Sequence, residues 1–196
     1  MGLTDVARDP ATFRRVMGQL ATGVTLITAQ AGAVQHGMTA NAVISVSLEP
    51  MLVLISVRRE ARMVAVLREA GHFVINILAR DQEPIARHFA GQPVLGPRPE
   101  LPIEPWEGGL RLAGCLAAIA CRVVDWLPGG DHWLVVGEVT ALALGEPGTP
   151  LLYYGGQYRT LAPAAPAPAP APDLLDSLGA ALYYDEGTPD PVPWDE

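Results

Sequence analysis

The stretch GMTANAVISVSLEPMLVLISV, residues 37–57, sets the expected fold of this chain. It predicts two short β-strands, at residues 42–46 and 51–57, because apolar and β-branched residues fill both runs and a proline-containing break separates them. A similar run precedes them at residues 24–29. Short strands that follow one another across Gly- or Pro-containing breaks favour antiparallel pairing.

A helix is expected before these strands. Asp9 and Pro10 form a helix start, since Asp can cap the free amides and proline fits the first helical position. Apolar residues then recur at helical spacing and indicate an amphipathic helix to about Ala21. These residues are Phe13, Val16, Met17 and Leu20.

Two more helices are expected after the strands. Residues 61–70 predict a helix that closes at Gly71, and residues 72–78 predict a strand. The next helix is predicted to start at an Asp81 cap and to run through Phe89.

The second half of the body predicts a long loop and two long strands. Residues 91–109 are rich in proline and glycine, and the strands follow at about residues 110–126 and 132–144. The sequence PGGD, residues 128–131, predicts the turn between them. The expected fold is therefore mainly β with a few helices, and many short strands suggest a small closed β-barrel. No G-x-G-x-x-G follows any predicted strand, which argues against a Rossmann dinucleotide site.

The composition changes after the body, which we expect to be one domain at residues 1–161. Residues 162–172 contain only proline and alanine, which predicts an extended linker. Residues 173–196 form an acidic tail, in which residues 173–184 carry leucines on one helical face. These leucines are Leu174, Leu175, Leu178 and Leu182. Two readings stay open: a disordered tail, or a short helix that docks on another protein or on the body.

The charged residues exclude several classes of protein. All 13 basic residues are arginine, so a Walker phosphate loop, a pyridoxal phosphate Schiff base and a lysine nucleophile are excluded. The net charge is −8, and seven acids and no bases follow Arg159. Residues 1–159 thus hold 14 acids against 13 arginines and are close to neutral. We expect no nucleic-acid partner, because no basic stripe is present.

Membrane, disulfide and metal chemistry are not expected either. The longest apolar run, residues 112–121, is far too short to cross a bilayer, and no secretory signal is visible at the start, so a cytoplasmic protein is expected. Cys115 and Cys121 are expected in one strand, roughly 20 Å apart at about 3.3 Å per residue, and cannot pair there. The histidines are scattered, so no metal site is predicted. They are His36, His72, His88 and His132.

Small polar residues in the opening stretch are candidates for ligand binding. Thr39, Asn41, Ser45 and Ser47 would let hydroxyls and amides approach a flat heteroaromatic ligand at a strand end. The segment VRREAR, residues 57–62, supplies three arginines beside a predicted helix start, where a phosphate could be neutralised. The alternatives are ordinary turn residues and a solvated loop.

Five motifs, taken in order, resemble the short-chain flavin reductase family. They are FRRVMGQLATGVTLIT, GMTANAVISVSLEPMLVLISV, FVINILARDQEPIARHFAG, GGDHWLVVGEVTAL and PLLYYGGQYRTL, within residues 10–161. The resemblance implies an FMN-binding split β-barrel and a homodimer with a flavin at each subunit interface. It also implies reduction of FMN or FAD by NADH or NADPH. Such proteins supply reduced flavin to a partner monooxygenase in aromatic or natural-product metabolism.

The resemblance assigns flavin-binding roles to particular residues. Thr39, Ala40 and Asn41 would border the flavin ring and its ribityl chain, and the following segment would line the ring. That segment consists of Ser45, Val46 and Ser47. On the phosphate side Ala61 stands where the family commonly has serine, and Arg58, Arg59 or Arg62 would compensate with charge-assisted hydrogen bonds. Phe89 resembles an aromatic residue near the flavin, and its alternative role is a core plug.

The nicotinamide side would involve His132, in the sequence GDH, as the catalytic candidate. Its alternative role is a surface histidine at a strand end. Tyr158 and Arg159 resemble the family's closing motif near the same pocket. Two other functions stay open: a flavin-binding biosynthetic enzyme of this fold that no longer reduces free flavin, and a binding module whose tail recruits the oxygenase.

Overall fold

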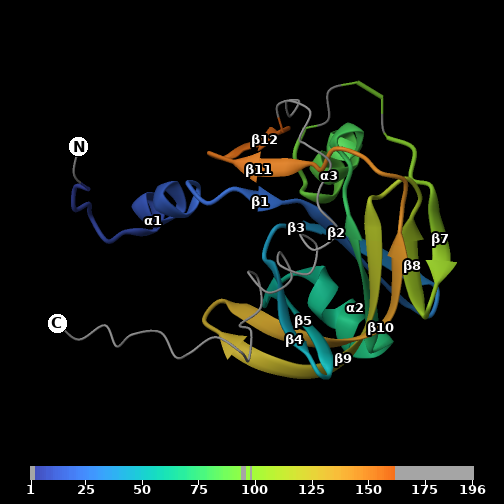
Figure 1. Ribbon diagram of the computed structural model, residues 1–196. Coiled ribbons are helices and arrows are strands. Elements are labelled where there is room, and N and C mark those ends of the chain that lie inside the picture. The colour runs from blue at the N-terminus through green and yellow to red at the C-terminus, as the bar shows by residue number, and fades with distance from the viewer. Residues whose placement is uncertain (1–2, 94–95, 98, 162–196) are drawn as a thin grey trace, which may run out of the picture. The chain divides into compact units, whose positions relative to one another are not determined.

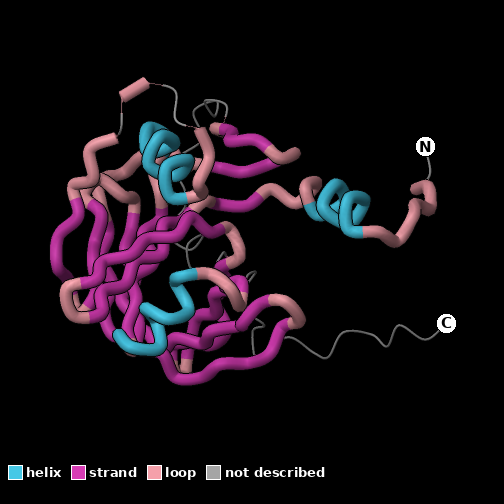
Figure 2. The backbone as a smooth tube through the Cα atoms, turned by 180° about the vertical axis from the view of Figure 1, so that it is seen from behind, coloured by secondary structure: helices cyan, strands magenta, loops and turns pink. Residues whose placement is uncertain are grey.

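The computed structural model describes residues 3–93, 96–97 and 99–161, and the predicted linker and acidic tail lie outside them. Within the described part the chain is mainly β, with α-helices α1 (Pro10–Met17), α2 (Arg62–Ala70) and α3 (Glu83–Phe89) and the short 3₁₀ helix η1 (Arg80–Gln82). Figures 1 and 2 show α1 standing beyond the strands, whereas α2 and α3 lie against them. The mainly β class with a few helices is confirmed.

Seven antiparallel strands form the main sheet, in the order β3-β2-β6-β9-β10-β5-β4. They are β2 (Thr25–Ala31), β3 (Val34–Ala40), β4 (Val43–Leu48), β5 (Met51–Arg58), β6 (His72–Ile77), β9 (Ala117–Gly129) and β10 (His132–Leu144). The two edge strands, β3 and β4, are consecutive in the chain, so the ladder stays open between them. The fold is split-barrel-like, and the fully closed barrel suggested by the short strands is not formed.

Five short strands make two further sheets. They are β1 (Thr22–Gly23), β7 (Ile103–Trp106), β8 (Gly109–Leu112), β11 (Leu152–Tyr154) and β12 (Gln157–Arg159). β11 pairs with both β1 and β12, and β7 pairs with β8.

The longest strands, β9 and β10, form the centre of the main sheet. His132 at the start of β10 lies opposite Gly129 of β9 and opposite Arg58 of β5. Gly130 has a φ of 70°, a left-handed conformation that suits glycine, and the predicted PGGD turn is confirmed. The end of this hairpin is thus fixed beside the end of β5.

The main core lies between α2 and the sheet. Met63 and Leu67 of α2 are fully buried with Ile55, Phe73 and Val135 of the strands. Apolar burial of this kind is the principal stabilising contribution to a small domain. The helix ends at Gly71, which adopts a φ of 68° and donates its backbone N–H to the Leu67 carbonyl.

Two sequence predictions about strands were wrong. The predicted strand 110–126 is divided into β8 and β9, since Gly114 turns the chain at a φ of 74°. Cys115 therefore lies outside any strand, and the single-strand reason for keeping it from Cys121 does not hold, although both thiols are free and buried. β7 lies inside the predicted loop 91–109, where it pairs with β8.

The helix ends also differ from expectation. Asp9 caps α1 as predicted, accepting hydrogen bonds from the amides of Ala11 and Thr12 at 2.9 and 3.0 Å, but α1 ends at Met17 and buries none of its residues. Asp81 does not cap a helix and lies within η1. Gln82 holds that turn instead, because its side-chain oxygen accepts the Ala79 N–H at 3.0 Å.

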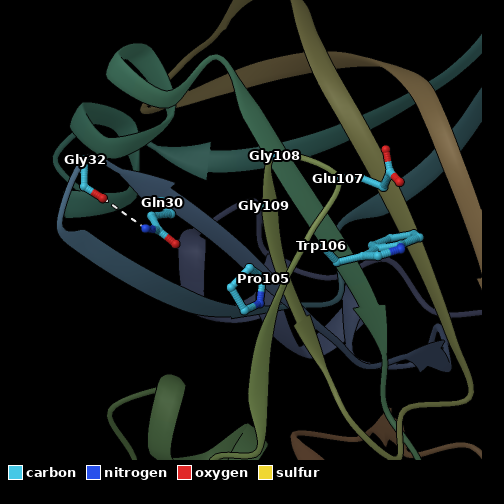
Figure 3. A pocket seen from close by; sticks show the side chains of 7 residues that line it. All are labelled: Gln30, Gly32, Pro105, Trp106, Glu107, Gly108 and Gly109. Atoms are coloured by element: carbon cyan, nitrogen blue, oxygen red, sulfur yellow. Dashed lines mark hydrogen bonds between the residues drawn. The ribbon is translucent and has the colours of Figure 1, made fainter.

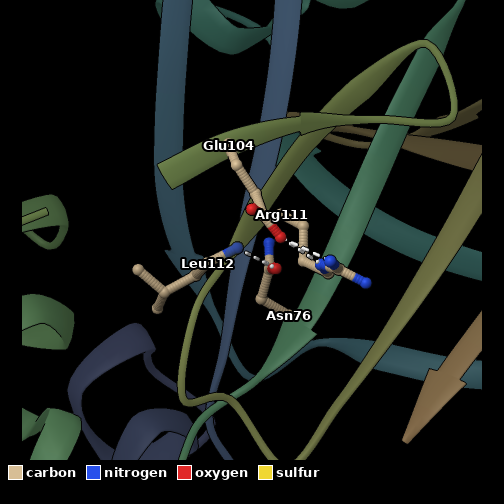
Figure 4. A network of polar contacts seen from close by, with 4 residues as sticks. All are labelled: Asn76, Glu104, Arg111 and Leu112. Atoms are coloured by element: carbon tan, nitrogen blue, oxygen red, sulfur yellow. Dashed lines mark hydrogen bonds and ion pairs between the residues drawn. The ribbon is translucent and has the colours of Figure 1, made fainter. Parts of the chain in front are cut away.

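A buried amide joins three strands of the body. Asn76 of β6 has no exposed surface and donates its side-chain N–H groups to the Leu26 carbonyl at 3.0 Å and the Thr28 hydroxyl at 3.1 Å, both on β2. Its oxygen accepts the backbone N–H of Leu112 on β8 at 2.8 Å (Figure 4). Figure 4 also shows the ion pair between Arg111 and Glu104 that crosses the β7–β8 hairpin. Asn76 therefore attaches β8 to the main sheet.

The described residues form neither a membrane-spanning helix nor a metal-binding cluster. Within those ranges no helix has the length and apolar character that a bilayer crossing requires. The same residues contain no group of three or more His, Cys, Asp or Glu side chains placed to share a metal ion. The cytoplasmic location stays a prediction.

The Asn76 network predicts a large loss of stability in Asn76→Ala. We expect the free energy of unfolding to fall by about 3 kcal/mol, because three buried partners lose hydrogen bonds worth about 1 kcal/mol each. Urea denaturation measures the change. Gln35→Ala removes an exposed amide from β3 and should cost less than about 0.5 kcal/mol. A similar small loss in both variants would contradict the role given to Asn76.

Candidate functional site

One hollow, of about 430 Å³, lies between the β2–β3 and β7–β8 turns (Figure 3). Its lining residues are Gln30, Gly32, Pro105, Trp106, Glu107, Gly108 and Gly109. None of the residues that the sequence singles out lines it. The Gln30 side chain donates a hydrogen bond to the Gly32 carbonyl at 3.0 Å, so its amide already has a partner within the turn.

A second hollow, of about 200 Å³, brings four predicted site residues together. Its lining residues are Val24, Thr39, Ala40, Asn41, Ala90, Gln92, Tyr153 and Tyr158. The end of β3 supplies one wall, the residues after α3 supply another, and the β11–β12 hairpin closes the third side. Residues far apart in the sequence thus meet at one place, which we call the β3 hollow.

The polar side chains of Thr39, in β3, and of Asn41, just after it, have defined partners at this hollow. The Thr39 hydroxyl donates to the Ala86 carbonyl of α3 at 2.7 Å, and the Asn41 amide donates to the Thr22 hydroxyl at 3.2 Å. Each side chain acts as a donor in these hydrogen bonds, so the Thr39 hydroxyl oxygen and the Asn41 side-chain oxygen can still accept hydrogen bonds. The two residues therefore hold α3 and β1 to β3 and also present acceptors to a ligand.

Two tyrosines form the aromatic side of the β3 hollow. The rings of Tyr153 and Tyr158 meet edge to face, with centroids 5.4 Å apart. The guanidinium of Arg87 lies 4.9 Å from the Tyr158 centroid and is held by Glu83 through a hydrogen bond of 2.8 Å. Burial raises the pKa of Tyr158, so its phenol stays neutral and can donate a hydrogen bond at neutral pH.

Phe89 lies beside β3 but does not line the hollow. It packs against a second core cluster that includes Leu26 and Ile85. Its ring also covers Gly37, where a Cβ atom would lie 2.5 Å from the Phe89 ring. Only glycine allows this close approach, which fixes the ring two residues from Thr39. The flavin contact assigned to Phe89 stays a prediction.

The three residues of β4 lie away from the β3 hollow in this chain. Ser45 is opposite Val53 and Ser47 is opposite Leu52, with a register shift between the two pairs. Val46 occupies this irregularity and is 48% exposed. The β3 hollow of a single chain therefore does not include the flavin-lining residues assigned on β4, which are Ser45, Val46 and Ser47.

The predicted phosphate side gathers at the start of α2. Ala61 is the N-cap residue and makes no side-chain capping bond, so the first amides of the helix have no hydroxyl partner there. Arg62 is the first residue of the helix. The pKa of His36 on β3 is lowered, mainly because the imidazole is partly buried and also because the positive charge of Arg62 is near. Arg58 is exposed and lies 3.9 Å from Glu60, a weak pairing.

His132 lies at the end of the β9–β10 hairpin, outside both hollows. Its Nδ1 is 2.8 Å from Oδ1 of Asp131, and this hydrogen bond lowers the pKa of the Asp131 carboxyl. A carboxylate acceptor favours the proton on Nδ1, which leaves Nε2 as the second contact point. The structure thus separates His132 from the group formed by Thr39, Ala40 and Asn41.

Sequence reasoning missed part of the β3 hollow. Tyr153 and Gln92 line it, and Arg159 does not, although Arg159 belongs to the same motif as Tyr158. The signal for Tyr153 was present, because a Gly-Gly turn between two tyrosine-containing runs places residues on one face of a hairpin. Gln92 carries no comparable local signal.

Comparison with known proteins gives a consistent result. A family model described as a flavin reductase like domain matches residues 17–162. The chain is 42% identical over 149 residues to the reductase component of 4-hydroxyphenylacetate 3-monooxygenase of Thermus thermophilus, covering 76% of this chain and 95% of that relative. It is also 42% identical over 164 residues to an NADH-dependent flavin reductase of a Rhodococcus species, covering 82% of this chain and 91% of that relative.

A solved structure agrees with these relatives. The NADH:FAD oxidoreductase of Streptomyces globisporus C-1027 superposes with a TM-score of 0.74 at 36% identity, covering 83% of this chain and 99% of that chain. The family match includes the end of β3, the β9–β10 hairpin and β11–β12, the elements on which the candidate residues lie. The sequence, the fold and these comparisons agree that the chain belongs to the flavin reductase like family.

Proposed function

We propose that this chain is an NAD(P)H-dependent flavin reductase that supplies reduced FMN or FAD to a partner monooxygenase. The observation that carries the proposal is family membership across residues 17–162, together with relatives named as flavin reductases and as reductase components of monooxygenases. The β3 hollow supports the same function, because its lining combines polar groups on one strand with two aromatic rings. A few polar groups in an otherwise apolar and aromatic lining are typical of cofactor sites.

The residues of the β3 hollow fit a flavin ring. Ala40 lets the ring approach the backbone of β3, and Thr39 and Asn41 offer acceptors at its polar edge. Tyr158 supplies an aromatic surface and a neutral phenol. When bound, the flavin would supply the electron chemistry by accepting a hydride from reduced nicotinamide. The protein positions the two rings, and no protein nucleophile is needed.

Charged and polar groups outside the β3 hollow would bind the flavin phosphate and the nicotinamide. Arg58 and Arg62 flank the uncapped start of α2, where amides and guanidinium groups together favour an anion. His132 would contact the nicotinamide side through Nε2, because its Nδ1 faces Asp131.

We also infer a homodimer in which each site draws on both subunits. The β3 hollow holds about 200 Å³, less than the roughly 300 Å³ at which small-molecule sites begin. The edge strand β4 exposes apolar side chains, with Ile44 at 56% and Leu48 at 57%. A second copy would cover this edge and bring β4 or His132 of the partner toward the hollow.

The proposed partner is a flavin-dependent oxygenase. Relatives are named as reductase components of monooxygenases, and a reductase component needs an oxygenase to use the reduced flavin. Residues 162–196 lie outside the described residues, and their part in such an association stays a prediction.

A turnover experiment tests the function. With added FMN or FAD the purified protein should oxidise NADH or NADPH, seen as loss of the reduced-nicotinamide absorbance, and anaerobic reaction should yield reduced flavin. Binding of flavin without nicotinamide oxidation would instead favour a biosynthetic enzyme that has lost reduction. No turnover with any combination of the two flavins and two nucleotides would refute the proposal.

Filling each hollow in turn tests the location of the flavin. Ala40→Trp places a large ring in the β3 hollow and should weaken flavin binding at least about tenfold, or about 1.4 kcal/mol. Gln30→Trp fills the larger hollow in the same way and should leave flavin affinity within about twofold. Titration by flavin fluorescence measures both. If Gln30→Trp weakened flavin binding more than Ala40→Trp did, the flavin would bind in the hollow beside Gln30, and its assignment to the β3 hollow would be wrong.

Sedimentation velocity tests the dimer. Ile44→Asp would place a carboxylate in the covered β4 edge, where burying an unpaired charge is costly, so the dimer should dissociate at protein concentrations that keep the unaltered protein dimeric. Val34→Asp changes an exposed apolar residue at the start of β3 and should stay dimeric. A monomeric unaltered protein would contradict the inference.

A further inference from the structure

Arg59, which follows β5, contacts three consecutive residues at the end of the β9–β10 hairpin. Its backbone N–H donates to the Asp131 carbonyl at 3.0 Å. Its side-chain Nε donates to the His132 carbonyl at 3.4 Å, and its guanidinium lies 4.6 Å from the Trp133 ring centroid. Arg59 therefore contacts the backbone carbonyl groups immediately before and after the His132 side chain.

The Trp133 ring is in turn held by α2 and β9. Arg68 of α2 lies 5.3 Å from the Trp133 centroid and 4.5 Å from that of Trp126. The two indoles meet edge to face at 6.1 Å, and both pack against the main core. Cations stacked on indole rings are attracted by the ring quadrupole. Trp133 is therefore a fixed surface on which the Arg59 guanidinium rests.

The orientation of His132 depends on this backbone. The His132 imidazole is hydrogen-bonded at 2.8 Å to the carboxylate of Asp131. Since the two residues are adjacent in the chain, both partners of that hydrogen bond belong to the same short segment. A shift of the segment would move them together. The backbone of His132 and Trp133 pairs with Arg58 and Val57 of β5. The Arg59 side chain adds contacts with the His132 carbonyl and the Trp133 ring.

We propose that Arg59 is a positioning residue for the nicotinamide side: it holds residues 131–133 so that the His132 imidazole is presented in one orientation. This inference rests on the proposed function, which assigns His132 to that side. It separates Arg59 from its neighbours Arg58 and Arg62. Because the guanidinium of Arg59 contacts an indole and a carbonyl, we assign Arg59 to positioning and the phosphate contact to Arg58 and Arg62.

Kinetics of Arg59→Ala test the proposal. The KM for the reduced nicotinamide should rise about five- to tenfold, as expected for losing one stacked cation and one hydrogen bond. The kcat and the dissociation constant of the flavin should stay within about twofold. Arg122→Ala, which removes an exposed ion pair with Glu138 farther along the same hairpin, should leave all three values unchanged.

Arg59→Lys separates positioning from charge. Lysine keeps the positive charge but lacks the planar guanidinium and its Nε–H, so it should not restore the KM. Recovery with lysine would mean that Arg59 acts as a simple charge toward a phosphate and would overturn the proposal. A weakened flavin affinity in Arg59→Ala with an unchanged nicotinamide KM would overturn it as well.

Hydrogen exchange gives a readout that needs no turnover. Amides of residues 129–134 should exchange at least about fivefold faster in Arg59→Ala than in the unaltered protein. Adding Arg59→Ala to Trp133→Leu should increase the exchange by less than the sum of the two single effects, because Trp133→Leu already removes the ring on which the Arg59 guanidinium rests. Unchanged exchange, or fully additive effects, would overturn the proposal. If the unaltered protein oxidised no nicotinamide, the proposed function would fail, while exchange would still show whether Arg59 holds the turn.

Discussion

The pairing of β10 with β5 on one side and β9 on the other is the constraint on which the rest of the structure depends. It sets His132 opposite Arg58 and Gly129, so the hairpin end and the end of β5 share one register. Because side chains alternate between faces along a strand, a slip by one residue would turn His132 and its neighbours to the opposite face. α2 follows β5 directly, so the same ladder also sets where its uncapped start lies.

The β3 hollow depends on a different set of contacts, made by an edge strand. The Thr39 hydroxyl binds the Ala86 carbonyl, and the Phe89 ring covers Gly37, so α3 is attached to β3 at two points. The β11–β12 hairpin then brings Tyr153 and Tyr158 across from it. The hollow is small in one chain, whereas β4 leaves apolar side chains exposed. Both observations have the same explanation if a second subunit completes the site.

Local signals predicted the elements that local chemistry determines. Asp9 caps α1, Gly71 ends α2 and the PGGD turn joins the two long strands, each as expected. β3 was missed because its sequence, VQHGMTA, has little strand character, and its conformation comes from pairing with β2. The resemblance selected Thr39, Ala40, Asn41 and Tyr158, which the fold brings together. It could not show that Ser45, Ser47 and His132 lie elsewhere in the same chain, since that follows from tertiary and subunit contacts.

The central claim is that the end of β3 receives the flavin ring. A crystal structure of the protein with bound FMN or FAD tests it most directly. The account predicts the ring against Thr39, Ala40 and Asn41, within reach of Tyr158, with a second subunit completing the site. A ring bound beside Gln30 and Trp106, or a ring held by one chain alone away from β3, would contradict it.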